Sequence, residues 1–176
     1  MGDKYADDRK NPSLAQCGTI SLRFNGKVLM MNASRVYTYH AVSGRGDGNG
    51  GFPLDAQAQH AKSMGPIPEG TYWISPKELI TNSWAHPFMS RSAWGNYRII
   101  IHPFTTTETH GRGGMFIHGG DTAGSAGCID LWSAMDDFVL DLNAEVGSND
   151  DCQIHLRVQY PEYGDFPPPS SQYRPT

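Results

Sequence analysis

The sequence predicts a mainly β domain with one amphipathic helix, and three observations support this fold class. Short runs of alternating or β-branched apolar residues recur along the chain and are separated by turn-forming residues. The 176 residues include 20 glycines and 12 prolines, which favours many turns over long helices. Aromatic residues make up 11% of the chain, a share typical of a folded protein rather than a disordered one. We therefore expect one folded, turn-rich domain.

The predicted strands begin with a hairpin. Residues 19–24 alternate apolar and polar side chains, Asn25-Gly26 is typical of a two-residue turn, and residues 28–31 form a second apolar run. Residues 35–42 predict a third strand, because tyrosine and valine side chains recur among polar ones.

The middle of the chain predicts a loop, a short helix and three further strands. Residues 43–51 contain five glycines in nine positions and indicate a flexible loop. Residues 54–64 predict a short helix, which ends at the segment GPIPEG of residues 65–70. The three strands are predicted at residues 71–75, residues 96–101 and Met115–His118.

The amphipathic helix is predicted at residues 133–146. Its apolar residues recur at helical spacing: Met135, Phe138, Val139, Leu142 and Val146. Ser133 is the expected N-cap, and Gly147 is a suitable C-terminal stop. A last strand is expected at residues 153–158, and the chain has no internal repeat.

The domain organisation has three parts. Residues 1–16 are a polar leader, residues 17–160 are the folded body, and residues 161–176 are a proline-rich tail. No apolar run approaches the ~18–20 residues that span a bilayer, and no apolar segment follows a basic start. We expect no membrane span and no classical export signal, and therefore synthesis in the cytoplasm.

Charge and metal-binding patterns exclude other classes. The net charge of −4 lacks the cationic field of a nucleic-acid-binding surface. His102, His110 and His118 recur every eight residues near Asp121, but H-E-x-x-H is missing, so we expect no catalytic metal. The glycine-rich loop resembles a calcium loop but has Ala58 where the twelfth-position glutamate belongs.

The candidate chemistry lies between His118 and Cys128. The histidine closes an apolar strand, and the cysteine follows ten residues later within a glycine-rich turn. A cysteine nucleophile acts as a thiolate and needs a base such as His118 to take its proton. The backbone N–H groups of Gly127 and Cys128 are candidate donors to the oxyanion that forms on attack. The alternative is a buried, inert cysteine beside an unrelated histidine.

These motifs resemble a known enzyme family. The runs IHGG at residues 117–120 and GSAGCIDL at residues 124–131 resemble the signature of L,D-transpeptidase catalytic domains of the YkuD type. AVSG at residues 41–44 and GPIPEGTYWI at residues 65–74 resemble upstream strands of that family. Within it, the chain is similar to compact, signal-less type VI secretion effectors that act on peptidoglycan. The resemblance implies a β-sandwich or barrel with short accessory helices.

The resemblance also implies residue roles. Cys128 corresponds to the acyl-forming nucleophile, His118 to its general base, and Gly119 to the position whose carbonyl holds the second imidazole nitrogen. Ser125 and Gly127 correspond to residues that shape the turn and contact the substrate. No cofactor is implied.

Four further positions bear on substrate binding. The chain has Ala126 where many family members have a histidine, and Asp130 where many have an arginine. Trp132, directly after the motif, is a candidate wall of the site, whereas Arg112 is a candidate ligand for a substrate carboxylate. A solvated loop arginine is the alternative for Arg112.

The implied substrate is the tetrapeptide stem of peptidoglycan. Attack after the L-centre of the third residue releases D-alanine, and water, an amine or a D-amino acid then accepts the acyl group. The implied setting is delivery by secretion machinery into the periplasm of a target bacterium, with a cognate immunity protein as a partner. In that oxidising compartment we hypothesise a disulfide between Cys17 and Cys152, which leaves Cys128 as the free thiol.

Two other classes stay open. A sortase-like transpeptidase also has histidine before cysteine, and Arg157 would be its late arginine, but Gly-Ser-Ala-Gly differs from the sortase Thr-Leu-x-Thr pattern. The other class is a non-enzymatic, β-rich cell-wall-binding module in which Cys128 is inert.

Overall fold

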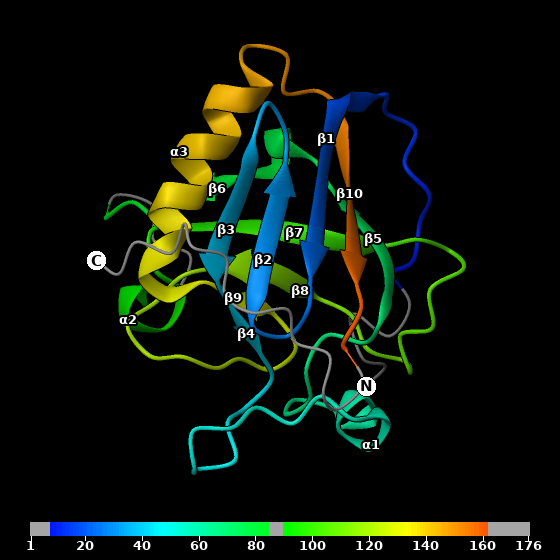
Figure 1. The fold of residues 1–176 in the computed structure, drawn as a ribbon, viewed down its shortest axis with the longest axis vertical. Coiled ribbons are helices and arrows are strands. Elements are labelled where there is room, and N and C mark those ends of the chain that lie inside the picture. Colours follow the sequence, from blue (N-terminus) through cyan, green and yellow to red (C-terminus); the bar gives the residue numbers. More distant parts are fainter. Residues whose placement is uncertain (1–7, 85–89, 162–176) are drawn as a thin grey trace.

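The strands join into one ten-stranded sheet in the computed structural model, which describes residues 8–84 and 90–161. The strands are β1 (Gln16–Phe24), β2 (Val28–Asn32), β3 (Val36–His40), β4 (Val42–Ser43), β5 (Gly70–Ile74), β6 (Ile80–Thr81), β7 (Tyr97–Pro103), β8 (Met115–His118), β9 (Ile129–Asp130) and β10 (Gln153–Val158). Their order is β3-β2-β1-β10-β5-β7-β8-β9-β4, and β6 pairs with β7 (Figure 1). The mainly β class is confirmed.

The sheet curls back on itself. Its two end strands, β3 and β4, are separated in the chain by Ala41 alone. The single strand predicted at residues 35–42 is therefore two strands, because β3 pairs with β2 whereas β4 pairs with β9. This change of partner at Ala41, which is fully buried, nearly closes the sheet into a barrel.

The predicted hairpin is present at the N-terminal side of the sheet. The side-chain oxygen of Asn25 accepts the backbone N–H groups of Lys27 and Val28 and shapes the turn between β1 and β2. β1 also pairs in parallel with β10, which lies beside it in Figure 1. Leu22 and Phe24 of β1 point into the core, as the alternating pattern predicts.

The amphipathic helix is α3 (Met135–Val146), and it covers part of the barrel (Figure 1). Its buried residues are Met135, Phe138, Val139 and Leu142. The prediction that Ser133 is the N-cap is wrong, because Ser133 lies within a 3₁₀ turn, η2 (Trp132–Ala134), that leads into the helix. Tyr39 of β3 donates to Asp141 at 2.8 Å, and this bond ties the helix to the sheet.

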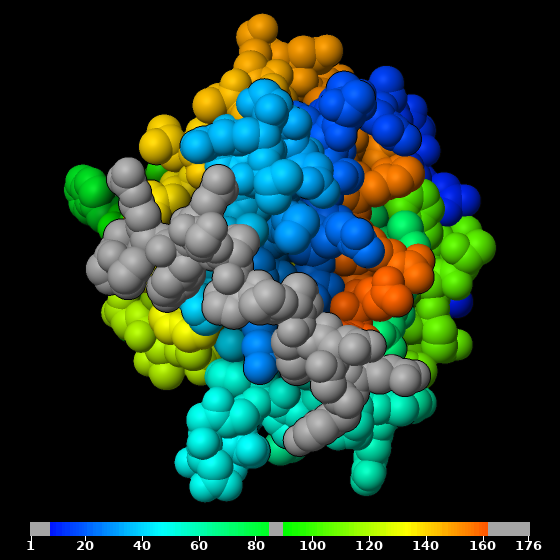
Figure 2. All heavy atoms as spheres, viewed as in Figure 1, coloured from blue at the N-terminus to red at the C-terminus, as the bar shows by residue number. Residues whose placement is uncertain are grey.

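The other helical segments are short. The helix predicted at residues 54–64 is present only as α1 (Ala56–His60), with Asp55 as its cap. The helix ends at Ala61, where the backbone becomes extended, and the chain then turns back at Gly65, where an added Cβ would lie 1.9 Å from the Ala58 carbonyl oxygen. Two further segments were not predicted from the sequence: α2 (Arg91–Trp94) and the 3₁₀ turn η1 (Pro76–Glu78). The glycine-rich loop and α1 protrude at the lower edge in Figures 1 and 2.

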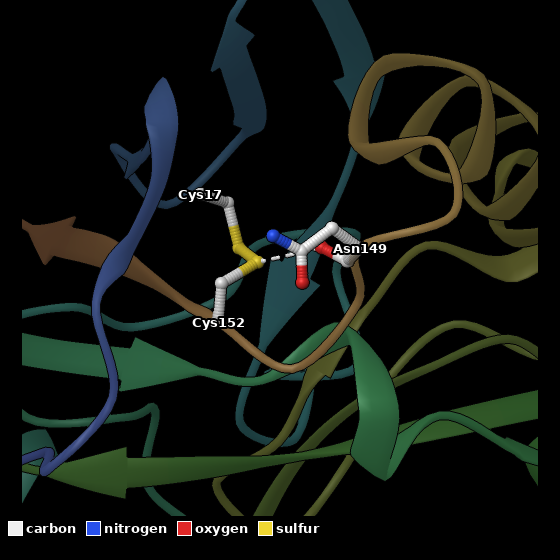
Figure 3. The surroundings of a disulfide bond; sticks show 3 residues. All are labelled: Cys17, Asn149 and Cys152. Carbon is white, nitrogen blue, oxygen red and sulfur yellow. Dashed lines mark hydrogen bonds between the residues drawn. A yellow bond between two sulfur atoms is a disulfide. The ribbon is translucent and has the colours of Figure 1, made fainter.

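Cys17 and Cys152 form a disulfide, as hypothesised (Figure 3). The bond joins β1 to the residue directly before β10, across a sequence separation of 135 residues. It lies next to the Gln16–Gln153 pair, after which the register between the two strands shifts before it resumes at Ser21. The disulfide therefore fixes the two strands where their ladder is interrupted.

The described part of the predicted leader lies against the body. The carbonyl of Lys10 accepts the indole N–H of Trp73, and the backbone N–H of Lys10 donates to the Pro103 carbonyl. Residues 1–7 of the leader and residues 162–176 of the predicted tail lie outside the described residues. No helix in the described part of the chain is both long and apolar enough to span a membrane.

Candidate active site

His118 stands at the end of β8 and is almost completely buried. Its Nδ1 lies 2.6 Å from the carbonyl oxygen of Gly119. A carbonyl oxygen only accepts hydrogen bonds, so Nδ1 carries the proton in the neutral ring. Nε2 is then the nitrogen with a free lone pair, and it is the atom that can act as a base. The contact with Gly119 that the resemblance implies is therefore present.

Trp94 covers one face of this histidine. The two ring centroids are 4.7 Å apart, and the rings are tilted by 36°. The carbonyl of Trp94 also accepts the Gly119 N–H at 3.2 Å, which ties α2 to the turn after β8. Gly120 has a φ of +149°, and an added Cβ would lie 2.9 Å from the Ser92 carbonyl oxygen. A glycine is needed here because the two segments touch.

His118 closes β8, and Cys128 directly precedes the neighbouring strand β9. β8 and β9 are parallel, with Ile117 opposite Ile129 and His118 opposite Asp130. Cys128 comes two residues before Asp130, in the turn that leads into β9. The predicted nucleophile therefore lies beside the start of the strand that pairs with the strand of the predicted base, and their direct pairing stays a prediction.

A hydrogen-bonded turn presents Cys128. The Ser125 hydroxyl donates to the Cys128 carbonyl at 2.7 Å, and the Ser125 N–H donates to the Gly44 carbonyl at 2.9 Å. The carboxylate of Asp130 accepts the N–H of Gly124 at 3.0 Å and that of Trp132 at 2.9 Å. Ser125 therefore supports the turn through the backbone, and the carboxylate binds a residue on each side of Cys128.

The surroundings of Cys128 disfavour its charged form. The side chain is 7% exposed and is the free cysteine of the described residues. Burial raises the pKa of the Cys128 thiol to about 12, with Asp130 acting in the same direction. A backbone hydrogen bond with Phe116 and the charges of Arg112 and Arg98 lower this pKa. The thiol is protonated at neutral pH, so a base must remove its proton during attack.

Asp130 is the acidic group at this site. It is fully buried, and burial raises its pKa. The N–H groups of Trp132 and Gly124 and the charge of His118 act in the opposite direction. Asp130 thus combines a structural role in the turn with an electrostatic interaction with the histidine. The sequence marked this position only as a departure from the family pattern.

Arg112 lies behind the cysteine turn and is 5% exposed, so the alternative of a solvated arginine is wrong. Its guanidinium donates to three backbone carbonyls: Gln59 at 2.7 Å, Pro66 at 2.6 Å and Gly65 at 2.8 Å. It also lies against Gly127, where an added Cβ would be 2.5 Å from Nη2.

Trp132 follows the turn with a φ of +43°, a left-handed conformation that is rare for a bulky residue. Its half-buried ring packs edge-on against His40 of β3, with ring centroids 6.2 Å apart. Its role as a wall of the site stays a prediction. Within residues 8–84 and 90–161, no group of three or more His, Cys, Asp or Glu side chains is arranged to hold a metal ion.

Comparison with known proteins identifies the family. Residues 38–147, more than half of the chain, match the Tlde1 domain. The chain belongs to the Tlde1 domain family. This is a family of type VI effector domains that are L,D-transpeptidase-like. None of the curated proteins matches the chain.

Two kinds of solved structure are similar to this Tlde1 domain. One is Bd1075 of Bdellovibrio bacteriovorus, with 13% identity and a TM-score of 0.49 over 89% of this chain and 52% of the other. The other is the helical cell shape determining protein Pgp2 of Campylobacter jejuni, with 15% identity and a TM-score of 0.47 over 90% of this chain and 54% of the other. The chain thus spans about half the length of these proteins.

Proposed function

We propose that this Tlde1 domain is a cysteine enzyme that modifies the tetrapeptide stems of peptidoglycan, as an L,D-carboxypeptidase, an L,D-transpeptidase or both. The observations that support the proposal are the bond between Nδ1 of His118 and the Gly119 carbonyl, and the position of Cys128 directly before β9, the strand that pairs with the His118 strand. The bond to Gly119 leaves Nε2 as the base, and we propose that Nε2 reaches the Cys128 thiol across the β8–β9 pair. Membership of a type VI effector family supports peptidoglycan as the substrate.

The proposed reaction begins with proton transfer. Nε2 of His118 takes the proton from the Cys128 sulfur, and the sulfur electron pair attacks the carbonyl carbon that follows the L-centre of the third stem residue. The N–H groups of Gly127 and Cys128 donate to the resulting oxyanion. As the C–N bond breaks, Nε2 returns the proton to the leaving amine of D-alanine. The product is a thioester on Cys128.

The acceptor decides the outcome of the second half-reaction. Water attacks the thioester to give a tripeptide, whereas an amine gives a cross-link and a D-amino acid gives exchange. In each case Nε2 takes the proton of the acceptor, and the Cys128 sulfur leaves as the thiol after reprotonation. Trp132 and the turn held by Ser125 are the proposed contacts for the stem.

The proposed site of action is the periplasm of a target bacterium, reached through the secretion machinery. The Cys17–Cys152 disulfide supports an oxidising compartment as the place where the folded enzyme works. A cell that produces such an effector needs a cognate immunity protein, which is the proposed partner.

Mass spectrometry of purified muropeptides tests the proposal. We expect the protein to convert tetrapeptide stems to tripeptides or, with an added D-amino acid, to exchanged tetrapeptides. Cys128→Ala removes the nucleophile and abolishes both products, while His118→Ala removes the base and slows them by about 10²–10⁴-fold. Far-UV circular dichroism of both variants controls for folding. Full activity of Cys128→Ala would contradict the proposal and favour a wall-binding module or another nucleophile.

A further inference from the structure

Arg112 carries a buried positive charge that its hydrogen bonds do not neutralise. The three oxygens that accept from its guanidinium belong to backbone carbonyls, which are polar but uncharged. No carboxylate in residues 8–84 or 90–161 lies within 4 Å of this guanidinium. Buried arginines are usually paired with an acid, because the charge is costly to remove from water. An arginine also does not lose its proton in a protein.

Three acidic groups interact electrostatically with this guanidinium: Tyr72, Tyr160 and Cys128. Burial raises the pKa of both tyrosines well above the ordinary value, so both hydroxyls are neutral at physiological pH. Their hydroxyls also donate to backbone carbonyls, at 2.7 Å for Tyr72 and 2.5 Å for Tyr160. The cysteine is therefore the acid of the three that loses its proton in the proposed reaction.

The contact with the cysteine turn is direct. Nη2 lies so near Gly127 that a methyl group at this glycine would be 2.5 Å from it. Gly127 also has a φ of +106°, which a larger side chain rarely adopts. Because Gly127, which directly precedes Cys128, has no side chain, the guanidinium of Arg112 can approach the backbone closely at this position.

Two arginines lower the pKa of Cys128, and Arg112 has the larger effect of the two. The other charged groups that act on Cys128 are Asp130 of β9 and Arg98 of β7, and His118 of β8 interacts with Asp130. Asp130 disfavours a thiolate, and the guanidinium of Arg98 lies over the rings of Phe116 and Trp94, at 5.0 and 5.9 Å from their centroids. Arg112 instead contacts the turn that carries Cys128, at Gly127.

We propose that Arg112 is a positioning residue whose permanent charge stabilises the negative sulfur of Cys128, and that it is not a ligand for a substrate carboxylate. The inference rests on the proposed role of Cys128 as nucleophile. When the S–H bond breaks, the proton moves to Nε2 of His118 and the electron pair stays on the sulfur. The guanidinium stabilises the negative sulfur of this charge-separated pair.

The test measures the reactivity of the thiol without any peptidoglycan. Iodoacetamide modifies Cys128 alone in the disulfide-intact protein, and intact-protein mass spectrometry gives its rate from pH 7 to 10. Below the thiol pKa this rate follows the thiolate fraction, which falls tenfold for each unit by which the pKa rises. We expect Arg112→Gln to react about tenfold more slowly than wild type at pH 8. Arg112→Lys, which keeps the charge, should stay within about threefold.

The control is Arg45→Gln, which removes an exposed arginine from the nearby loop and should leave the rate unchanged. If Arg112→Gln does not fold, Arg112→Met tests the same loss of charge while keeping an apolar stem of similar length. An uncharged variant that reacts as fast as wild type overturns the inference. If alkylation slows equally in Arg112→Lys and in the uncharged variant, the inference is also overturned. The planar shape of the guanidinium would then matter rather than its charge.

The proposed function can fail separately. If the alkylation rates differ as expected but wild type leaves muropeptides intact, the charge effect on Cys128 stands and the peptidoglycan activity does not. If wild type releases D-alanine and the rates do not differ, the enzyme stands and the role of Arg112 is overturned.

Discussion

The two cysteine regions of this domain are equally buried but chemically different. Cys17 and Cys128 are each 7% exposed, and Cys152 is 4% exposed. Cys17 and Cys152 meet between β1 and the start of β10 and have become a covalent link. Cys128 lies at the end of a turn, with a histidine on the neighbouring strand and no thiol to pair with among the described residues.

The difference shows that neighbouring groups, rather than burial, decide what a cysteine does. At the disulfide, two backbone segments are joined where the β1–β10 register shifts. Around Cys128, charged groups of both signs act on the sulfur: Asp130, Arg112 and Arg98. We therefore expect changes at the first region to alter stability and changes at the second to alter reactivity.

The largest expected effect on stability comes from the disulfide. The double variant Cys17→Ser and Cys152→Ser opens a loop of 135 residues, so the free energy of unfolding should fall by about 5 kcal/mol. Urea unfolding followed by circular dichroism measures this loss. Iodoacetamide alkylation of Cys128 in the folded double variant should keep its wild-type rate, because the bond is far from the site in the strand order.

Wild-type protein unfolded in the presence of a reductant is the matched control and should lose a similar free energy. A loss below about 1 kcal/mol would contradict a stabilising role for the disulfide. A changed alkylation rate would show that the two regions are coupled.

The fold was predictable where strands are long and local. The β1–β2 hairpin and β10 follow from alternation and an Asn-Gly turn. Three strands of two residues each, β4, β6 and β9, are too short to show any period, and they exist because distant partners pair with them. The split of one predicted strand at Ala41 likewise depends on the closure of the sheet.

The candidate site was predictable to a different degree. His118 and Cys128 carry a recognisable motif, so the sequence selected them together with Gly119. Trp94 reaches the histidine from α2, which comes more than twenty positions earlier in the chain and which no periodicity predicted. The burial of Arg112 depends on carbonyls from residues 59–66, which only tertiary structure brings close.

A second expected effect separates geometry from charge at Cys128. In Asp130→Asn one of the two N–H groups, of Gly124 or Trp132, loses its acceptor, because an amide has a single acceptor oxygen. D-alanine release from muropeptides should fall about tenfold as the turn loosens. Removal of the negative charge lowers the pKa of Cys128, so alkylation should not slow.

Asp121→Asn is the matched control, because this carboxylate is exposed in the same loop. It should change neither rate. If alkylation of Asp130→Asn slows as much as D-alanine release, charge and geometry do not separate in this way.

The smallest expected effect is a pH-dependent loss of stability that Cys128 alone produces. Its pKa rises from about 8.5 in the unfolded chain to about 12 in the fold, so the folded state holds the proton more tightly. The stability that this tighter proton binding contributes is fully present below pH 8.5. It is lost as the pH rises toward 12, by up to about 1.4 kcal/mol of unfolding free energy per pH unit. Urea unfolding at pH 7.5 and pH 9.5 should therefore show wild type losing about 1 kcal/mol more than Cys128→Ala.

The disulfide cysteines do not titrate, so this difference in stability is due to Cys128. Equal losses in the two proteins would mean that the fold does not suppress ionisation of Cys128, and the need for a base during attack would lose its main support.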